Sequence, residues 1–128
     1  MEPGSKHFRK RDAILSYLRQ TTEHPSAETV YAALKAEIPD LSLGTVYRNI
    51  SLFKQQGQIV SLGAVHGVER YDGNTHPHVH FVCTGCGCIR DLHGLHVPEE
   101  LNTSAAREAD ATVDHCDLTF HGRCRTCV

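Results

Sequence analysis

The sequence predicts an α+β fold in two parts, and three observations support this. Apolar residues recur at helical spacing in the first half of the 128 residues, short strand patterns follow, and all six cysteines lie in the second half. Charge divides the chain in the same way. Residues 1–60 hold eight Lys and Arg against six Asp and Glu, whereas residues 61–128 hold five against nine. We therefore expect a mildly basic part, residues 1–72, a hinge at 73–77, and an acidic part, residues 78–128.

Three helices are expected in the first part, because apolar residues return every three or four positions. Ser26 and Ser42 each precede such a pattern and are candidate N-caps. Gly57 is a good stop signal for the third helix. The first helix should end near residues 20–22, the second at Pro39-Asp40, and the third should span about 42–56.

A hairpin should follow these helices. Its expected strands are 59–62 and 68–71, with a glycine-containing turn at 63–67. Three helices followed by a hairpin is the element order of a winged helix-turn-helix, in which the third helix enters the DNA major groove.

The second part should form a small α/β unit after the turn-forming residues 72–77. The expected elements are strands at about 79–83 and 88–92, a helix near 98–109 and a strand at about 112–121. No apolar stretch approaches the roughly 18 residues of a membrane helix, and no apolar segment of a signal peptide follows the basic N-terminal residues. We therefore expect a cytoplasmic protein with no membrane partner.

The strongest motif is a pair of Cys-x-x-Cys sequences, Cys83–Cys86 and Cys124–Cys127. Each two-residue spacer lets a turn direct both sulfurs at one point, so four thiolates can hold a tetrahedral structural zinc ion. Free or disulfide-bonded cysteines would leave two matched pairs at opposite ends of the acidic part unexplained. Cys88 and Cys116 are expected to be buried small hydrophobic residues rather than ligands.

Two histidines, His78 and His80, lie directly upstream of the first cysteine pair. Residues i and i+2 of a strand point to the same face, so both imidazoles can reach one ion. The alternative is that both are solvent-facing strand histidines. Asp72 and Asp91 lie near them in the sequence, and a mixed nitrogen and oxygen set favours iron or manganese over thiophilic zinc.

Five runs of residues occur in the order and spacing of a known family. They are Leu43-Gly-Thr-Val-Tyr-Arg-Asn49, Arg70-Tyr-Asp72, His78-Val-His80, Cys83-Thr-Gly-Cys86-Gly and Cys124-x-x-Cys127. From about residue 8 to 127 the chain resembles the ferric uptake regulator family of metal-dependent bacterial repressors. The resemblance implies a winged helix, a C-terminal α/β dimerisation domain, a homodimer and a palindromic double-stranded DNA operator.

Within the family, the chain resembles the peroxide-sensing branch most closely. That branch uses three histidines and two aspartates, and the matching positions are His24, Asp72, His78, His80 and Asp91. The resemblance implies Fe(II) or Mn(II) at this site and oxidation of His24 or His78 by hydrogen peroxide. Iron-sensing members typically carry two glutamates instead. An iron- or manganese-sensing uptake regulator with short carboxylates remains the alternative.

DNA contacts are expected on the third helix. Tyr47 and Arg48 follow its first turn, from which a tyrosine ring can pack on a thymine methyl and an arginine can reach guanine acceptors. Alternatively, Tyr47 is partly in the core and Arg48 contacts only phosphate. With the positions that the resemblance adds, the expected DNA-binding residues are Ser42, Thr45, Tyr47, Arg48, Asn49 and Lys6.

Two other classes of protein are less well supported. A non-heme iron enzyme would use His78, His80 and a carboxylate as a facial triad, but a winged helix supplies no substrate cleft. In addition, His24 and the second aspartate would fill the open coordination positions. A zinc-ribbon interaction module would leave the run from Leu43 to Asn49 unexplained. We therefore predict a repressor rather than an enzyme.

Overall fold

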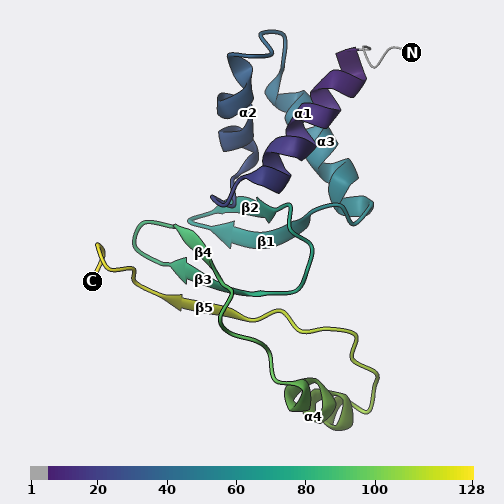
Figure 1. Ribbon diagram of the computed structural model, residues 1–128, viewed down its shortest axis with the longest axis vertical. Helices are drawn as coiled ribbons and strands as arrows, with labels where there is room; N and C mark the ends of the chain where they lie inside the picture. The colour runs from purple at the N-terminus through teal and green to yellow at the C-terminus, as the bar shows by residue number, and fades with distance from the viewer. Residues whose placement is uncertain (1–5) are drawn as a thin grey trace. The chain divides into compact units, whose positions relative to one another are not determined.

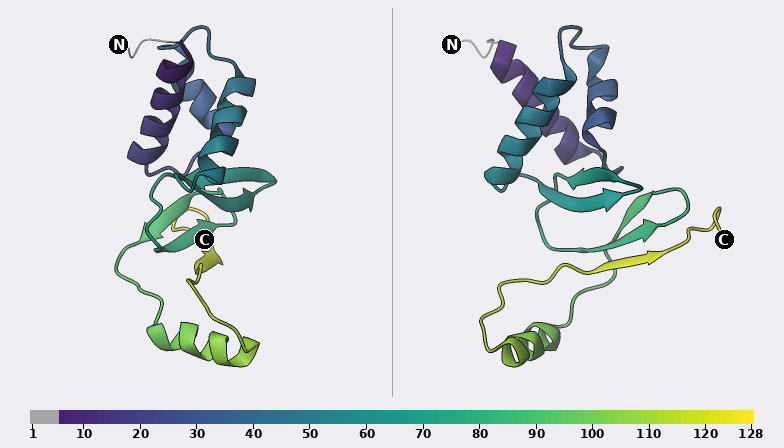
Figure 2. Two further views of the ribbon diagram at one scale, coloured as in Figure 1. Left: turned by 90° about the vertical axis from the view of Figure 1, so that its right-hand side faces the viewer. Right: turned by 180° about the vertical axis from the view of Figure 1, so that it is seen from behind.

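The computed structural model describes residues 6–128, with side chains from residue 9 onward. The chain divides into two compact units, of which one ends at Thr75 and the other runs from His76 to Val128. Figures 1 and 2 trace the elements of each unit. The first unit holds α1 (Lys6–Gln20), α2 (Ala27–Lys35), α3 (Leu43–Gln55), β1 (Val60–Val65) and β2 (Val68–Asp72). The second holds β3 (Val79–Cys83), β4 (Ile89–Leu92), α4 (Glu99–Ala109) and β5 (Thr119–Gly122).

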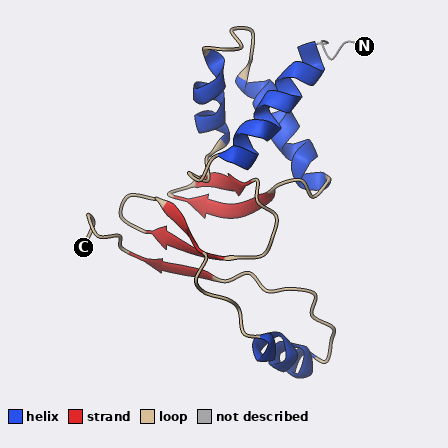
Figure 3. Cartoon of the chain, viewed as in Figure 1, coloured by secondary structure: helices blue, strands red, loops and turns tan. Residues whose placement is uncertain are grey.

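The first unit is a winged helix-turn-helix, as the sequence predicts. Its three helices and its hairpin share one apolar core, and Figure 3 separates the two kinds of element by colour. The buried core residues are Ile14, Leu18, Ala27, Val30, Leu34, Leu41, Val46, Ile50, Phe53, Ile59 and Tyr71. Each large side chain among them contributes about 1.5–3 kcal/mol by leaving water. The core therefore fixes the exposed face of α3 relative to β2.

Both predicted N-caps are confirmed. Ser26 Oγ accepts a hydrogen bond from the backbone N–H of Thr29 at 3.1 Å, and Ser42 Oγ accepts one from that of Thr45 at 3.1 Å. Each cap satisfies a donor that the first turn of a helix leaves open, and each is worth about 1 kcal/mol.

The second helix is shorter than predicted, because α2 ends at Lys35 and not at Pro39-Asp40. The chain tightens directly after Lys35, where the N–H of Glu37 donates to the carbonyl of Leu34, three residues earlier, at 3.1 Å, and Pro39 disfavours a helical conformation at Ile38. The Lys35 ammonium group donates to the carbonyl oxygens of Pro39 and Leu41 at 2.7 and 2.8 Å, which closes the connection to α3.

The hairpin turn is also shorter than the predicted 63–67. β1 pairs antiparallel with β2 out to Val65 opposite Val68, so the turn consists of His66 and Gly67 alone. Both have positive φ, 53° and 79°, as a two-residue type I′ turn requires. The strand passes through Gly63 (φ 83°) at an irregularity in the register, so this glycine marks a bulge instead of a turn.

The second unit is built on a three-stranded sheet in the order β4-β3-β5. β4 pairs antiparallel with β3, whereas β5 pairs parallel with it. The predicted strand at 112–121 is wrong over residues 112–118, since β5 begins at Thr119. Thr119 pairs with His80, the second residue of β3. Because the two strands are parallel, residues before Thr119 would have to pair with residues just before β3, where the described chain forms no strand. In the described part of the chain, no helix is long and apolar enough to cross a membrane.

Candidate functional site

His24 and Asp72 meet inside the first unit. His24 lies in the connection between α1 and α2, and Asp72 is the last residue of β2. His24 Nε2 is 3.4 Å from Asp72 Oδ2, and both side chains are buried. A buried imidazole beside a buried carboxylate is costly unless a proton or a cation balances the charge.

Two residues of β2 hold the His24 segment in place, Arg70 through its side chain and Tyr71 through its backbone. The Arg70 guanidinium donates through Nε to the carbonyl of His24 and through Nη2 to that of Glu23, the latter at 3.0 Å. The N–H of Tyr71 donates to the carbonyl of Pro25 at 3.0 Å. His24 has φ 53°, a conformation that non-glycine residues rarely adopt, so these bonds stabilise an otherwise unfavourable backbone.

Asp72 is oriented by the chain that follows it. Its Oδ1 accepts from the N–H of Asn74 at 2.9 Å, so the other oxygen faces His24. Gly73 passes so close to α1 that a Cβ there would lie 2.4 Å from the carbonyl oxygen of Leu18. Only glycine fits at this position without displacing backbone.

A second group, His78, His80 and Asp91, forms inside the other unit. His80 and Asp91 are direct partners across β3 and β4, and His78 immediately precedes β3. Oδ1 of Asp91 lies 2.8 Å from His78 Nε2 and 3.2 Å from His80 Nε2. His78 Nδ1 lies 2.6 Å from the carbonyl oxygen of His76, which can only accept, so Nδ1 carries the proton. Nε2 of His78 is then the nitrogen that faces Asp91.

The donors of each group, taken by itself, suit a borderline divalent cation. Neighbouring ligand atoms of an octahedral ion bound at about 2.1 Å are about 3.0 Å apart. The separation of 3.4 Å within the first group, and those of 2.8 and 3.2 Å within the second, lie around that value. Imidazole nitrogens combined with carboxylate oxygens suit iron or manganese. The hydrogen bond from His78 Nδ1 to a carbonyl is the usual way in which a protein orients a ligating imidazole.

Five of the six cysteines, all except Cys116, lie at the turn between β3 and β4 or in the chain beyond β5. Sγ of Cys86 and Sγ of Cys124 are 3.8 Å apart. Cys83 is fully buried, and its sulfur accepts from the backbone N–H of Cys86 at 3.4 Å and of Cys124 at 3.3 Å. These donors, that of Cys124 foremost, lower the pKa of Cys83 to about 5. A thiolate there is therefore stabilised, as a zinc ligand must be.

Cys127 lies against Gly85, beside the first cysteine pair, but outside the set of sulfurs that lie within 4.8 Å of one another. The other two cysteines also differ from expectation. The Cys127 thiol interacts with those of Cys124 and Cys83. Cys88 and Cys116 are half-buried rather than buried. The sulfur of Cys88 lies among the other sulfurs, within 4.8 Å of those of Cys83, Cys86 and Cys124. The description of Cys88 as a small core residue is therefore wrong.

The expected DNA-binding residues lie at the N-terminal end of α3. Tyr47 is 42% exposed, and its hydroxyl donates to Glu28 of α2. Arg48 is exposed and donates through Nη2 to Thr45 Oγ1 at 3.0 Å. Asn49 donates to the carbonyl of Thr45 at 2.9 Å, and Ser42, the N-cap, is exposed. Lys6 is the first residue of α1, and its side chain lies outside the described ones.

The sequence model of one protein family, the ferric uptake regulator family, matches residues 2–121. The chain belongs to this family. The resemblance found in the sequence is thereby confirmed. Members of the ferric uptake regulator family are transcription regulators, so the enzyme hypothesis is set aside.

Several similar proteins are peroxide regulators. The peroxide operon regulator of Bacillus subtilis is 36% identical over 128 residues, covering 98% of this chain and 86% of the relative. The peroxide-responsive repressor PerR of Staphylococcus epidermidis is 35% identical over 118 residues, covering 92% and 78%. Among solved structures, the Campylobacter jejuni peroxide stress regulator matches with a TM-score of 0.79 and 30% identity, covering 95% of this chain and 91% of that one. The ferric uptake regulator from Francisella tularensis with iron matches with a TM-score of 0.78 and 25% identity, covering 99% and 97%.

Among the described residues, sequence reasoning named every member of the two His/Asp groups and of the cysteine cluster except Cys88, and it missed the residues that position them. Arg70 belongs to a recognised run, but nothing in the sequence connects it with His24, 46 positions earlier. The contact of Glu28 with Tyr47 is equally non-local. Cys88 could have been found from its spacing, because Cys86-x-Cys88 places a third sulfur two residues after the first pair.

Proposed function

We propose that this chain is a metal-dependent, DNA-binding transcriptional repressor that senses hydrogen peroxide. The observation that carries the proposal is the pair of ligand groups, in which Asp72 lies beside His24 in one unit and Asp91 lies beside His78 and His80 in the other. This set is the one that the peroxide-sensing branch implies, and the chain is 35% and 36% identical to two peroxide regulators.

One regulatory ion, Fe(II) or Mn(II), is bound by all five side chains. His24 and Asp72 come from the DNA-binding unit, and His78, His80 and Asp91 come from the other. An ion that needs ligands from both units binds only one mutual arrangement of them, so it selects that arrangement from the ensemble. The hinge between the units is proposed at residues 73–77. Metal level is thereby coupled to DNA affinity.

Peroxide acts on a ligand histidine, His24 or His78. Bound Fe(II) supplies the redox chemistry that activates peroxide next to the imidazoles. Overall, one ring C–H becomes C–O, the histidine loses two electrons, and H₂O₂ is reduced. One of its oxygen atoms enters the ring, and the other leaves as water. The oxidised ring would be a poorer ligand, so the remaining side chains would hold the ion less tightly and repression would end.

A structural zinc ion supports the second unit. Its ligands are proposed to be Cys83, Cys86, Cys124 and Cys127, and the 3.8 Å separation of two of the sulfurs suits a tetrahedral site. This unit carries the homodimer contacts. A two-fold dimer presents two copies of α3, which match a palindromic operator when they are about 34 Å apart. The cytoplasm is the proposed location, since a bacterial repressor meets its DNA there.

Base and phosphate contacts are proposed for the exposed end of α3. Arg48 and Tyr47 read base edges, and the remaining contacts position the helix. The full proposed set is Ser42, Thr45, Tyr47, Arg48, Asn49 and, from α1, Lys6.

The test compares His24→Ala with His96→Ala, since His96 is an exposed histidine outside both groups. Fluorescence anisotropy with Mn(II) measures binding to an operator selected from random duplexes, while gel filtration and zinc analysis report the fold. His24→Ala should remain a zinc-loaded dimer and lose Mn(II)-dependent DNA binding, whereas His96→Ala should behave as wild type. Full Mn(II)-dependent binding by His24→Ala would contradict the proposal.

A further inference from the structure

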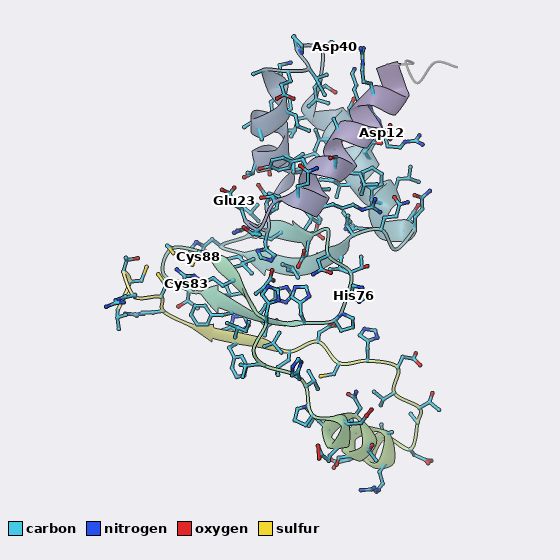
Figure 4. All side chains as sticks on the ribbon, in the orientation of Figure 1. Asp12, Glu23, Asp40, His76, Cys83 and Cys88 are labelled. Atoms are coloured by element: carbon cyan, nitrogen blue, oxygen red, sulfur yellow. The ribbon has the colours of Figure 1, made fainter. Side chains whose placement is uncertain are left out.

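Cys88 is brought to the cysteine cluster by a tight turn. The N–H of Cys83 donates to the carbonyl of Cys88 at 2.9 Å, and the N–H of Gly87 donates to that of Cys83 at 2.9 Å. Gly87 has φ 80°, a left-handed conformation that glycine adopts without strain. The chain therefore turns back at Gly87, just before Cys88. Figure 4 labels Cys83 and Cys88 close together at this end of β3 and β4.

The sulfur positions match a zinc tetrahedron that includes Cys88. Zinc binds thiolates at about 2.3 Å, so neighbouring sulfurs of a tetrahedral site lie about 3.8 Å apart. The Cys86 and Cys124 sulfurs are 3.8 Å apart, and those of Cys83, Cys86, Cys88 and Cys124 are all within 4.8 Å of one another. Only a small contraction around an ion is needed for these four to coordinate together.

Cys127 competes for the same position. Its Sγ lies 2.9 Å from where a Cβ on Gly85 would be, which places it against the first cysteine pair. The same Cβ would lie 3.6 Å from the sulfur of Cys83, so the sulfurs of Cys83 and Cys127 both border Gly85. The described part of the chain therefore gathers five sulfurs around a site where a structural zinc ion takes four.

We propose that Cys88 is an alternative fourth ligand of the structural zinc, exchanging with Cys127 while Cys83, Cys86 and Cys124 remain bound. The inference rests on the zinc site of the proposed function. It follows that one thiol of the cluster is uncoordinated at any moment, and that loss of Cys127 does not empty the site.

The test measures zinc per chain after dialysis against a weak chelator. Cys127→Ser should keep about one zinc ion per chain, as a fully occupied site does, because Cys88 replaces the lost thiolate. The double variant Cys88→Ser/Cys127→Ser should lose it. Cys116→Ser/Cys127→Ser is the matched control, since Cys116 is also half-buried but lies outside the cluster, and it should keep its zinc.

X-ray absorption at the zinc edge then identifies the ligands. Cys127→Ser should show four sulfurs at about 2.3 Å, whereas three sulfurs and one oxygen or nitrogen would overturn the proposal. Zinc-free or unfolded Cys127→Ser, beside a zinc-loaded wild type, would also overturn it while leaving the four predicted ligands intact. A wild type without zinc would instead contradict the zinc site of the proposed function.

Discussion

The hydroxyl of Tyr47 donates to Glu28 Oε2 at 2.5 Å and joins the exposed end of α3 to α2. The bond lowers the pKa of Glu28 and raises that of Tyr47, because it stabilises the carboxylate and the neutral phenol together. Its contribution is lost as pH falls through the depressed pKa of Glu28 or rises through the elevated pKa of Tyr47. At neutral pH the ring is therefore held in one direction on the proposed DNA-binding face.

Replacing Glu28 with Gln should lower the pKa of Tyr47, since the charged acceptor is removed. Absorbance titration of tyrosinate measures the change. The titration step that is present in wild type and absent from the Tyr47→Phe variant belongs to Tyr47, one of the four tyrosines. Glu37→Gln, at an exposed glutamate beyond α2, is the control and should leave the titration unchanged. An identical curve for Glu28→Gln and wild type would show that the bond is not populated in solution.

Replacing Arg48 with Ala should weaken binding to the selected operator by about 1–3 kcal/mol, or roughly 5- to 150-fold. Binding to a scrambled duplex should change much less, because base readout is specific and phosphate contact is not. Fluorescence anisotropy measures both. Arg90→Ala, at an exposed arginine of β4, is the control. Equal losses on the two duplexes would leave Arg48 with a positioning role only.

Replacing Gly73 with Ala should destabilise the first unit by about 1–3 kcal/mol, the usual cost of overpacking. The added Cβ would lie 2.4 Å from the carbonyl oxygen of Leu18 and 2.7 Å from the N of Arg19, and neither backbone group can move freely. Thermal unfolding followed by circular dichroism measures the loss. Gly94→Ala is the control, because a Cβ there meets nothing within 4 Å. Equal unfolding temperatures for the two variants would contradict this prediction, since they would show that α1 moves away from the added Cβ without a loss of stability.

Replacing Cys83 with Ser should abolish zinc binding and dimerisation. Cys83 is the fully buried cysteine on which N–H groups of Cys86 and Cys124 converge, and the binding energy of a structural metal is part of the folding energy. Zinc analysis and sedimentation measure both properties. A zinc-loaded dimer with this substitution would refute the assignment of Cys83 to the zinc site.

The features that the sequence predicts well are those that depend on local chemistry. Ser26 and Ser42 are recognisable as caps because each precedes an amphipathic pattern by one position. The cysteine pairs and His78-x-His80 are likewise readable from short spacings, because turns and strands have fixed geometry.

The features that it does not predict depend on contacts between distant residues. β5 is shorter than its sequence pattern because β3 sets where pairing can begin. Arg70 supports His24, and Leu18 forces glycine at 73, only because the fold brings β2 beside the end of α1. Apolar periodicity and propensity contain no information on such long-range pairs.

The most direct test of the central claim is peptide mass spectrometry of the Fe(II)-loaded protein after stoichiometric peroxide, with operator binding followed in the same sample. The account predicts a mass increase of one oxygen atom at His24 or His78, together with loss of DNA binding, and neither change in protein loaded with Mn(II). Unmodified histidines in Fe(II)-loaded protein that keeps its DNA would contradict peroxide sensing, and would favour an iron- or manganese-sensing regulator with the same five ligands.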